Sequence, residues 1–514
     1  MALSKLKKTD TKKTPRKSKF AEIASELSSL INVFILVLIF ITFVMRTFII
    51  PTGSMADTLM GAHFRLRCPQ CGYKYNHDFS PERYRVPANT IPKGTVQPPP
   101  TRCPNCGYYN HNPQLSLVTK GDKIFVLKYL YQFVEPKRWD VIVFNYPGDP
   151  LVNYIKRLVA LPGETVEIID GDVYIDGKIS AKPPKVQNEL WMTVYDNDYQ
   201  PIHPMQKKFN LHYWEQPFNL NNSLWTIDKD NPTAFCLDGH DGQVHTFFYD
   251  TSIGNNFRAT YAYDDMAFYE TMPYCSDLMT RLYITAAGPE ATLAIALGKY
   301  GILYKGGIDL KTREMFISRI DQDSEEILAR GTVEAPGFEK SVSVNFKNVD
   351  HKLVLDFGGK NLAYDLGPGP DDAGQRNTDI EPEVKIIGSG NLKIAHIAIF
   401  RDIHYTSRQN GISGKAARAT LGSPLKLDEK EYFVLGDNSP ISGDGRWWNV
   451  PGRGNNGKTF RTGIVPRQCL VGKAWVVVWP SGYKPFEKFP FRFIPNAGRM
   501  RFISGGSDSR QCLD

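Results

Sequence analysis

Beyond residue 46 the sequence lacks any apolar stretch long enough for a second membrane-spanning helix. It also lacks a G-x-S-x-G segment, so the nucleophile elbow of the α/β-hydrolases has no support. Acidic residues are scarce at the start of the chain, where Asp10 stands alone among the Lys and Arg of residues 1–19. The net charge of +8 is therefore concentrated in this tail, and a general nucleic-acid surface is not expected.

The N-terminus does contain one long apolar run. Residues 27–45 carry no charge, and Glu26 and Arg46 flank them. About 20 apolar residues cross a bilayer as a helix, and basic residues before such a helix place that end in the cytoplasm. A cleaved signal peptide is the alternative, but this run is too long and ends without a small-residue cleavage site. We therefore expect a basic cytoplasmic tail at 1–26 and an uncleaved anchor at 27–46.

The remaining sequence favours strands over helix bundles. The chain has 514 residues, which suggests two to four domains, and 12% of them are aromatic. Short apolar segments at 122–133, 140–147, 152–177, 431–438 and 472–480 are separated by turn residues, including the Asp-Gly pairs at 170–171 and 176–177. These segments predict an antiparallel β domain that is discontinuous in sequence.

Two blocks interrupt this β pattern. The first, at 61–114, contains two C-P-x-C-G units, which supply Cys68, Cys71, Cys103 and Cys106. Two such units suit tetrahedral zinc in a zinc-ribbon-like module, although disulfides are an alternative because the block is expected outside the cytoplasm. Four thiolates leave no open position, so any zinc is structural, and no cofactor is expected for catalysis.

The second block, at 181–425, has its own alternation of apolar and polar residues. Val342, Val344 and Phe346 share one face, and Leu353, Leu355 and Phe357 repeat the pattern after a turn. Short strands with polar turns indicate a β-sandwich, which resembles the jelly-roll form of concanavalin or laminin-G domains through its strand pattern. Such an insert could bind glycans or proteins, or serve as a spacer.

A candidate nucleophile follows the apolar run, in the segment PTGSM at 51–55. The hydroxyl of Ser54 needs a base, and no His stands in a suitable context. A neutral Lys can act instead if burial lowers its pKa. Lys156 is the best candidate because strand alternation places it on a mainly apolar face, although a lone Lys there often reaches solvent.

Four segments in order resemble the conserved boxes of type I bacterial signal peptidases. They are PTGSM with Leu59, RWDVIVF at 138–144, YIKRLVALPGE at 154–164 and GDNSPISGDGR at 436–446. The resemblance covers about 47–60, 115–178 and 428–480. It implies a mainly β peptidase domain at 47–60, 115–180 and 426–485, followed by a C-terminal tail at 486–514.

The resemblance also implies roles for single residues. Ser54 matches the nucleophile, Lys156 the general base, Thr52 an oxyanion-hole residue and Ser442 a residue that orients the lysine. Asp444 and Arg446 match a structural ion pair beneath the site. The positions that shape small apolar substrate pockets are matched by Ile50, Met55, Leu59, Tyr154 and Ile155.

The function implied by the resemblance is removal of signal peptides by a membrane-bound Ser/Lys endopeptidase. Its expected partners are exported preproteins with Ala-x-Ala-type cleavage sites, the lipid bilayer and the export machinery. Its expected location is the bacterial inner membrane, with a single span and the catalytic bulk outside the cytoplasm. One alternative is an inactive anchored scaffold that presents the cysteine module and the β-sandwich to partners. A self-cleaving Ser/Lys repressor is disfavoured by the anchor and by the lack of a DNA-binding helical region.

Overall fold

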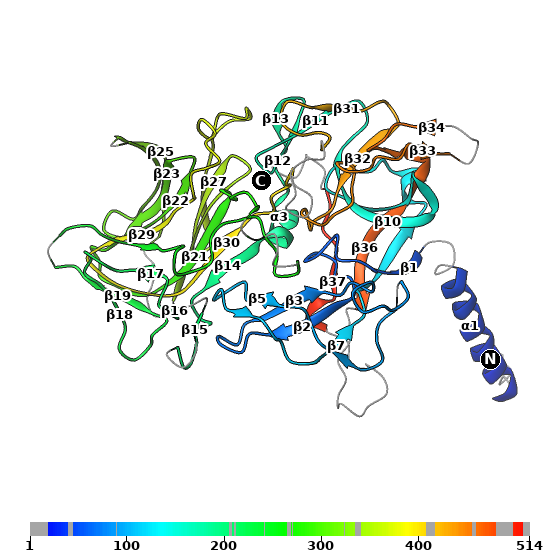
Figure 1. The fold of residues 1–514 in the computed structure, drawn as a ribbon, viewed down its shortest axis with the longest axis horizontal. Helices are drawn as coiled ribbons and strands as arrows, with labels where there is room; N and C mark the ends of the chain where they lie inside the picture. The colour runs from blue at the N-terminus through cyan, green and yellow to red at the C-terminus, as the bar shows by residue number, and fades with distance from the viewer. Residues whose placement is uncertain are drawn as a thin grey trace, which may run out of the picture.

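The computed structural model describes residues 19–39, 45–88, 90–204, 208–209, 212–240, 242–264, 269, 271–322, 324–334, 341–407, 417–454, 459–479 and 497–506. Strands dominate these residues, which confirms the predicted mainly β class. In Figure 1 the sheet that combines blue, cyan and orange-to-red strands lies on the right. Two green-to-yellow sheets lie on the left, and the blue strands of the cysteine block lie below.

The longest helix is α1 (Lys19–Ile39), which overlaps the predicted anchor. Residues 1–18 and 40–44 lie outside the described residues. Within the described part of the chain, no helix meets the combined length and apolarity needed for a membrane span. The short helices α2 (Leu130–Phe133) and α3 (Pro184–Leu190) belong to the folded body.

The sheet that carries the candidate site draws its strands from both ends of the chain. Its order is β1-β8-β36-β9-β10-β32-β35, with β37 paired to β36, and the pairs are antiparallel. Its strands are β1 (Met45–Ile49), β8 (Lys123–Lys128), β9 (Val141–Tyr146), β10 (Asp149–Ala160), β32 (Glu431–Leu435), β35 (Val465–Pro466), β36 (Leu470–Trp479) and β37 (Arg501–Phe502).

Strand β10 is positioned by its two neighbours over different parts of its length. It pairs with β9 from Asn153 to Arg157, but its pairing with β32 begins only at Arg157. The edge of β10 before Arg157 is therefore not covered by β32. This uncovered stretch includes Lys156.

A smaller sheet packs beside this one. Val166, Val173, Phe433 and Leu435 share one buried cluster, so the two sheets have a common core. The order of the smaller sheet is β13-β12-β11-β31. Its strands are β11 (Thr165–Ile169), β12 (Asp172–Ile175), β13 (Lys178–Ile179) and β31 (Leu425–Lys426).

The cysteine block forms a separate small sheet of order β3-β2-β7-β4 and a short hairpin. Phe64, Phe79 and Val118 form the buried centre beneath the sheet. The strands are β2 (His63–Arg67), β3 (Lys74–Asp78), β4 (Thr95–Val96) and β7 (Ser116–Thr119), with β5 (Thr101–Arg102) and β6 (Tyr109–Asn110) in the hairpin.

The large insert contains two antiparallel sheets that share one extensive hydrophobic core, an arrangement like a β-sandwich. One has the order β18-β19-β30-β21-β26-β27-β28, with β14 paired to β30, and the other has the order β17-β20-β29-β22-β23-β24-β25. The first comprises β14 (Met192–Asp196), β18 (Trp225–Ile227), β19 (Phe235–Asp238), β21 (Leu278–Ala287), β26 (Val342–Val349), β27 (Lys352–Phe357), β28 (Lys360–Asp365) and β30 (Asn391–Arg401). The second comprises β17 (Phe218–Asn219), β20 (His245–Tyr249), β22 (Thr292–Lys299), β23 (Ile302–Asp309), β24 (Glu314–Asp321), β25 (Ser324–Thr332) and β29 (Val384–Ser389).

The segments that flank the two sheets pack toward the peptidase-like core. Val186 and Leu190 of α3 lie in the same buried cluster as Val159 and Phe433, and Ile403 joins them. The predicted insert limits of 181 and 425 therefore enclose residues that complete the neighbouring core.

Candidate active site

The candidate nucleophile lies in a tight loop, residues 51–62, which follows β1. The Ala56 N–H donates to the Gly53 carbonyl at 2.9 Å, and the Leu59 N–H donates to the Met55 carbonyl at 2.7 Å. The Met60 N–H donates to the buried Asp122 carboxylate at 2.9 Å. These bonds hold the nucleophile loop in one conformation, in which Ser54 is partly exposed.

Lys156 reaches Ser54 from β10. Its Nζ lies 2.6 Å from Ser54 Oγ and 3.1 Å from the Ile155 carbonyl oxygen. The Lys156 residue is only 4% exposed, and its Nζ lies 5.5 Å from the centre of the Tyr154 ring. The structure therefore brings together the two residues that the sequence nominates as nucleophile and base.

The surroundings of Lys156 favour its neutral form. Burial is the main cause, and it lowers the pKa of Lys156 to about 8, although Asp444 and Asp437 oppose this shift. Arg446 adds a smaller lowering effect on the same pKa. A lysine with this pKa is substantially neutral in mildly alkaline solution and can accept a proton from a hydroxyl 2.6 Å away.

The loop at 436–446 closes the site from the other side. The Asn438 N–H donates to the Ser54 carbonyl at 3.1 Å. Asp444 and Arg446 are both fully buried and form a bidentate ion pair, with contacts of 2.9 Å and 2.7 Å. The Gly436 N–H donates to Asp444 at 3.0 Å, so the predicted ion pair also orders the start of this loop.

The structure gives less direct support for the predicted roles of Ser442 and Thr52. The Ser442 hydroxyl is buried and has no hydrogen-bond partner among the described residues. A Cβ on Gly436 would lie 2.1 Å from the Ser442 Oγ, so this close approach requires glycine at 436. Thr52 lies two residues before Ser54 with an exposed side chain.

Most of the predicted pocket residues belong to an apolar cluster that includes part of the nucleophile loop. Ile50, Met55 and Leu59 are buried in one cluster, and Ile155 packs against it. Tyr154 belongs to a neighbouring cluster and stacks on Tyr146 with 4.5 Å between ring centres.

One part of the site was missed by the sequence analysis. Arg157 is fully buried and forms a bidentate ion pair with Asp437, with contacts of 2.8 Å and 2.7 Å. This pair ties β10, directly after Lys156, to the loop that contacts Ser54. The adjacent Lys and Arg in the segment YIKR were a signal, since alternation places the two on opposite faces of the strand.

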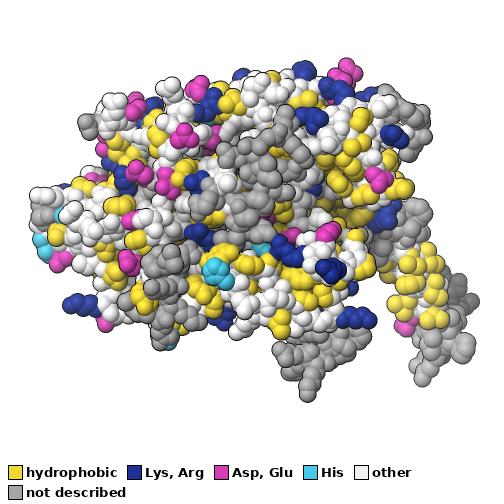
Figure 2. All heavy atoms as spheres, in the orientation of Figure 1, with side chains coloured by type: hydrophobic (Ala, Val, Ile, Leu, Met, Phe, Trp, Pro, Cys, Tyr) yellow, Lys and Arg dark blue, Asp and Glu magenta, His cyan; other side chains and the backbone are white. Residues whose placement is uncertain are grey.

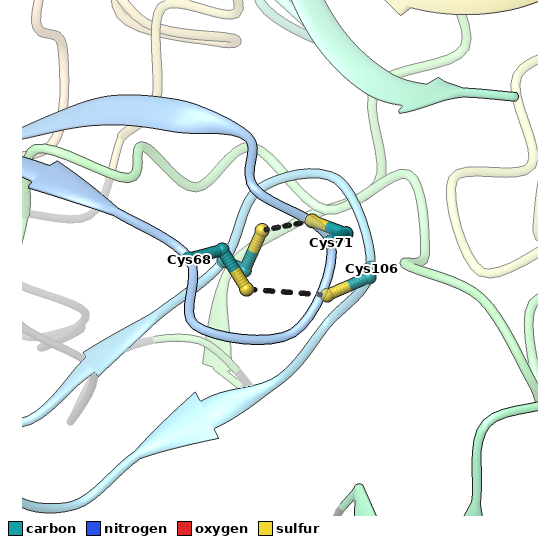
Figure 3. A group of neighbouring side chains, drawn as sticks. Cys68, Cys71 and Cys106 are labelled. Carbon is teal, nitrogen blue, oxygen red and sulfur yellow. Dashed lines mark hydrogen bonds between the residues drawn. The ribbon is translucent and has the colours of Figure 1, made fainter. Parts of the chain in front are cut away.

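The four predicted metal-ligand cysteines converge in the cysteine block. Figure 3 shows the labelled Cys68, Cys71 and Cys106 turned toward a common centre. The Sγ atoms of Cys68 and Cys106 are 3.7 Å apart, and those of Cys71 and Cys103 are 3.6 Å apart. A disulfide needs about 2.05 Å, whereas four sulfurs about 2.3 Å from one zinc ion would be separated by about 3.8 Å. The donor set therefore fits zinc better than it fits disulfides.

Comparison with known proteins identifies one family whose model matches two stretches of the chain. Residues 109–224 and 388–479 match the family described as "Signal peptidase, peptidase S26". The match includes Lys156 and the 436–446 loop and begins after Ser54. Over these residues the chain is similar to this family.

Individual relatives of the S26 family match over shorter stretches. The signal peptidase I of Bacillus licheniformis is 31% identical over 116 residues, which cover 21% of this chain and 61% of the relative. A probable signal peptidase I-2 of Synechocystis is 30% identical over 112 residues, covering 18% and 48%. The signal peptidase I of Rickettsia prowazekii is 28% identical over 156 residues, covering 30% and 44%. The chain thus spans about half the length of these curated relatives.

Among solved structures, a carbohydrate-binding module from Bacillus subtilis aligns with 36% of this chain and 93% of its own length. The sequence identity is 7% and the TM-score is 0.22. A similarity at this level gives no information about a ligand of the insert.

Proposed function

We propose that this chain is a membrane-anchored serine endopeptidase that removes signal peptides from exported preproteins. The observation that carries the proposal is the 2.6 Å contact between Lys156 Nζ and Ser54 Oγ, in a chain whose residues 109–224 and 388–479 match the S26 family. The substrate class is a preprotein with small residues at an Ala-x-Ala-type cleavage site, and the substrate reaches the site from the export machinery.

In the proposed reaction, neutral Lys156 accepts the Ser54 hydroxyl proton as Ser54 Oγ attacks the scissile carbonyl carbon. The Ser54 N–H and the Thr52 hydroxyl stabilise the oxyanion, and Ser442 orients the lysine. One oxyanion donor typically contributes about 10²–10³ in rate. Protonated Lys156 then gives its proton to the leaving amine, and a water molecule activated by Lys156 hydrolyses the acyl-enzyme.

The N-terminal segment is the proposed anchor, located in the bacterial inner membrane with the N-terminus in the cytoplasm. The side chains of residues 26–38 of α1 are exposed, and most of them are apolar. Figure 2 shows this hydrophobic surface on a helix that projects from the body of the protein. A bilayer is the environment in which such a surface loses contact with water.

The cysteine block is the proposed site of one structural zinc ion. Cys68, Cys71, Cys103 and Cys106 would bind it, and all four are buried. Zinc would hold the two cysteine turns together and supply no step of the reaction.

The dyad is tested with detergent-solubilised full-length protein and a preprotein that carries an Ala-x-Ala site. Ser54→Ala and Lys156→Met should each abolish detectable cleavage. The exposed Ser423 and Lys430 supply matched controls, since Ser423→Ala and Lys430→Met make the same changes on the surface and should retain full cleavage. Cleavage by both dyad variants at the wild-type rate would refute the proposal.

The zinc assignment is tested by metal analysis of the purified protein. Wild type should contain about one zinc per chain, and Cys68→Ser should contain much less. Cys469→Ser is the matched control because Cys469 is buried but lies outside the group of four. Equal metal content in wild type and Cys68→Ser would exclude zinc at this site.

A further inference from the structure

A segment of the large insert reaches out of its two sheets and contacts the candidate active site. Residues 258–264, which we call the strap, lie between β20 and β21. Arg401 of β30 holds the base of the strap, since its guanidinium donates to the Thr260 carbonyl and lies 5.2 Å from the Tyr261 ring centre. The strap is therefore attached to the insert at one end and touches the peptidase sheet region at the other.

The strap packs on the nucleophile loop through Tyr263. The Tyr263 hydroxyl donates to the Ala62 carbonyl at 3.2 Å, and Tyr261 and Tyr263 share a buried cluster with Ala56 and Met60. The ring of Tyr263 also occupies the space beside Gly53, where a Cβ would lie 2.0 Å from a ring carbon. Glycine directly before Ser54 is therefore required by a tyrosine of the insert.

The strap also holds the 436–446 loop. The Tyr261 hydroxyl donates to the Asp437 carbonyl at 3.0 Å. The Asn438 side-chain amide donates to Asp264 at 2.6 Å, while its backbone N–H donates to the Ser54 carbonyl. One short segment thus contacts both loops that meet at Ser54.

We propose that the strap is a positioning element for the reaction, so that the insert sets the geometry of Ser54 and Lys156. Tyr261 and Tyr263 are its positioning residues, acting through the 436–446 loop and the nucleophile loop. This inference rests on the proposed peptidase function for its kinetic consequence. Its structural content, the ordering of two loops by the insert, can be measured without activity.

The variants Tyr261→Phe and Tyr263→Phe each remove one hydroxyl and keep the ring. Loss of a hydrogen bond of this kind should lower kcat/KM roughly three- to tenfold, because the nucleophile and the base lose their alignment. The matched control is Tyr304→Phe, since Tyr304 is a fully buried tyrosine of the same insert whose hydroxyl donates to the Ala373 carbonyl at 3.2 Å. The control should keep wild-type kcat/KM.

The pH profile separates positioning from a general loss of stability. Asp437 and Asp444 favour the protonated form of Lys156, and Arg446 opposes it. When Tyr261→Phe releases the Asp437 carbonyl, the attraction between Asp437 and Lys156 weakens, and the midpoint of the pH–rate profile should move downward. Tyr304→Phe should leave the midpoint unchanged even if its melting temperature falls by the same amount.

Hydrogen exchange supplies a readout that does not need catalysis. The amides of Ala56, Leu59 and Asn438 should exchange faster in Tyr261→Phe and Tyr263→Phe than in wild type, and at the wild-type rate in Tyr304→Phe. The inference is overturned if all three variants behave alike in exchange. If wild type cleaves no preprotein, the proposed function fails, and the exchange comparison alone decides whether the strap orders the two loops.

Discussion

Three lysines are buried among the residues that the structure describes, and they stand in two kinds of surroundings. Lys156 contacts a hydroxyl and a carbonyl oxygen beside Ser54. Lys182 forms ion pairs with Asp350 and Asp402, the latter at 2.9 Å, and Lys299 forms an ion pair with Asp277. Lys182 and Lys299, with their carboxylate partners and Asp172, lie where the smaller sheet meets the insert.

The difference shows that burial alone does not determine the charge of a lysine. Burial acts to lower the pKa of each of these lysines, but only at Lys156 does this effect outweigh the nearby charges. At Lys182 the carboxylates of Asp350 and Asp402 outweigh burial and hold its pKa well above the usual value. Asp277 does the same for Lys299. A direct carboxylate contact therefore separates a structural lysine from one that can act as a base.

The largest effect on stability is expected at the paired lysines. Lys182→Met leaves the buried carboxylates of Asp350 and Asp402 without their cation, which should lower the free energy of unfolding by about 3–5 kcal/mol. Denaturant unfolding measures this change. The control is Lys311→Met at an exposed ion pair with Glu290, which should change the free energy of unfolding far less because solvent screens this pair. Equal losses in the two variants would show that burial does not distinguish the pairs.

Replacement of Lys156 by Met should raise the free energy of unfolding, whereas replacement of Lys182 by Met should lower it. The pKa of Lys156 is about 8 in the folded protein and 10.5 as its ordinary value, so the unfolded chain binds more protons between these pH values. The stability penalty of the buried lysine is therefore largest below pH 8 and disappears above pH 10.5. Lys156→Met should gain up to about 3 kcal/mol at pH 7 while losing cleavage. A loss of stability at pH 7 would contradict this account.

Cleavage by wild type should depend on pH through the same group. Because the base must be neutral, kcat/KM should rise about tenfold per pH unit below the pKa and level off above about pH 8. A series of assays from pH 6 to pH 10 on one preprotein measures the profile. A rate that stays constant across this range would argue against Lys156 as the base.

The smallest effect is expected at Asp172. Burial and the charge of Asp277 raise its pKa well above the ordinary value, although Lys299 and Lys182 oppose them. The folded protein therefore holds a proton that the unfolded chain releases above about pH 4, and this residue lowers stability as the pH rises. Asp172→Asn should gain about 1 kcal/mol over wild type between pH 5 and pH 8. The exposed Asp379→Asn should show no such gain.

The sequence allowed the fold class and the family to be predicted because both depend on local patterns. Alternating apolar residues and Asp-Gly turns predicted a mainly β chain, which the strands confirm. The boxes around Lys156 and at 436–446 lie within the residues that match the S26 family. The catalytic roles of Ser54 and Lys156 stay predictions, to which the structure adds their 2.6 Å contact.

The remaining features depend on contacts between distant residues. Asp437 pairs with Arg157 across 280 positions, and no local pattern relates the two. Tyr261 and Tyr263 lie in a loop without strand periodicity, so nothing in their neighbourhood indicated a contact with Gly53. Asp172 lies in the smaller sheet, whereas Asp277, Asp350 and Asp402 lie in the insert. Because these four carboxylates are buried together where the two parts meet, the sequence alone did not indicate their burial.

The order of strands in the main sheet has a consequence for the time at which activity can appear during synthesis. β8 and β9 are made early, but β36, which lies between them, comes after the whole insert. A ribosome therefore produces Ser54 and Lys156 long before the strand that joins the two sides of their sheet. Until then β8 and β9 have unpaired edges that are open to wrong partners. A nascent chain that stops before residue 470 would contain both members of the dyad and still lack an assembled peptidase.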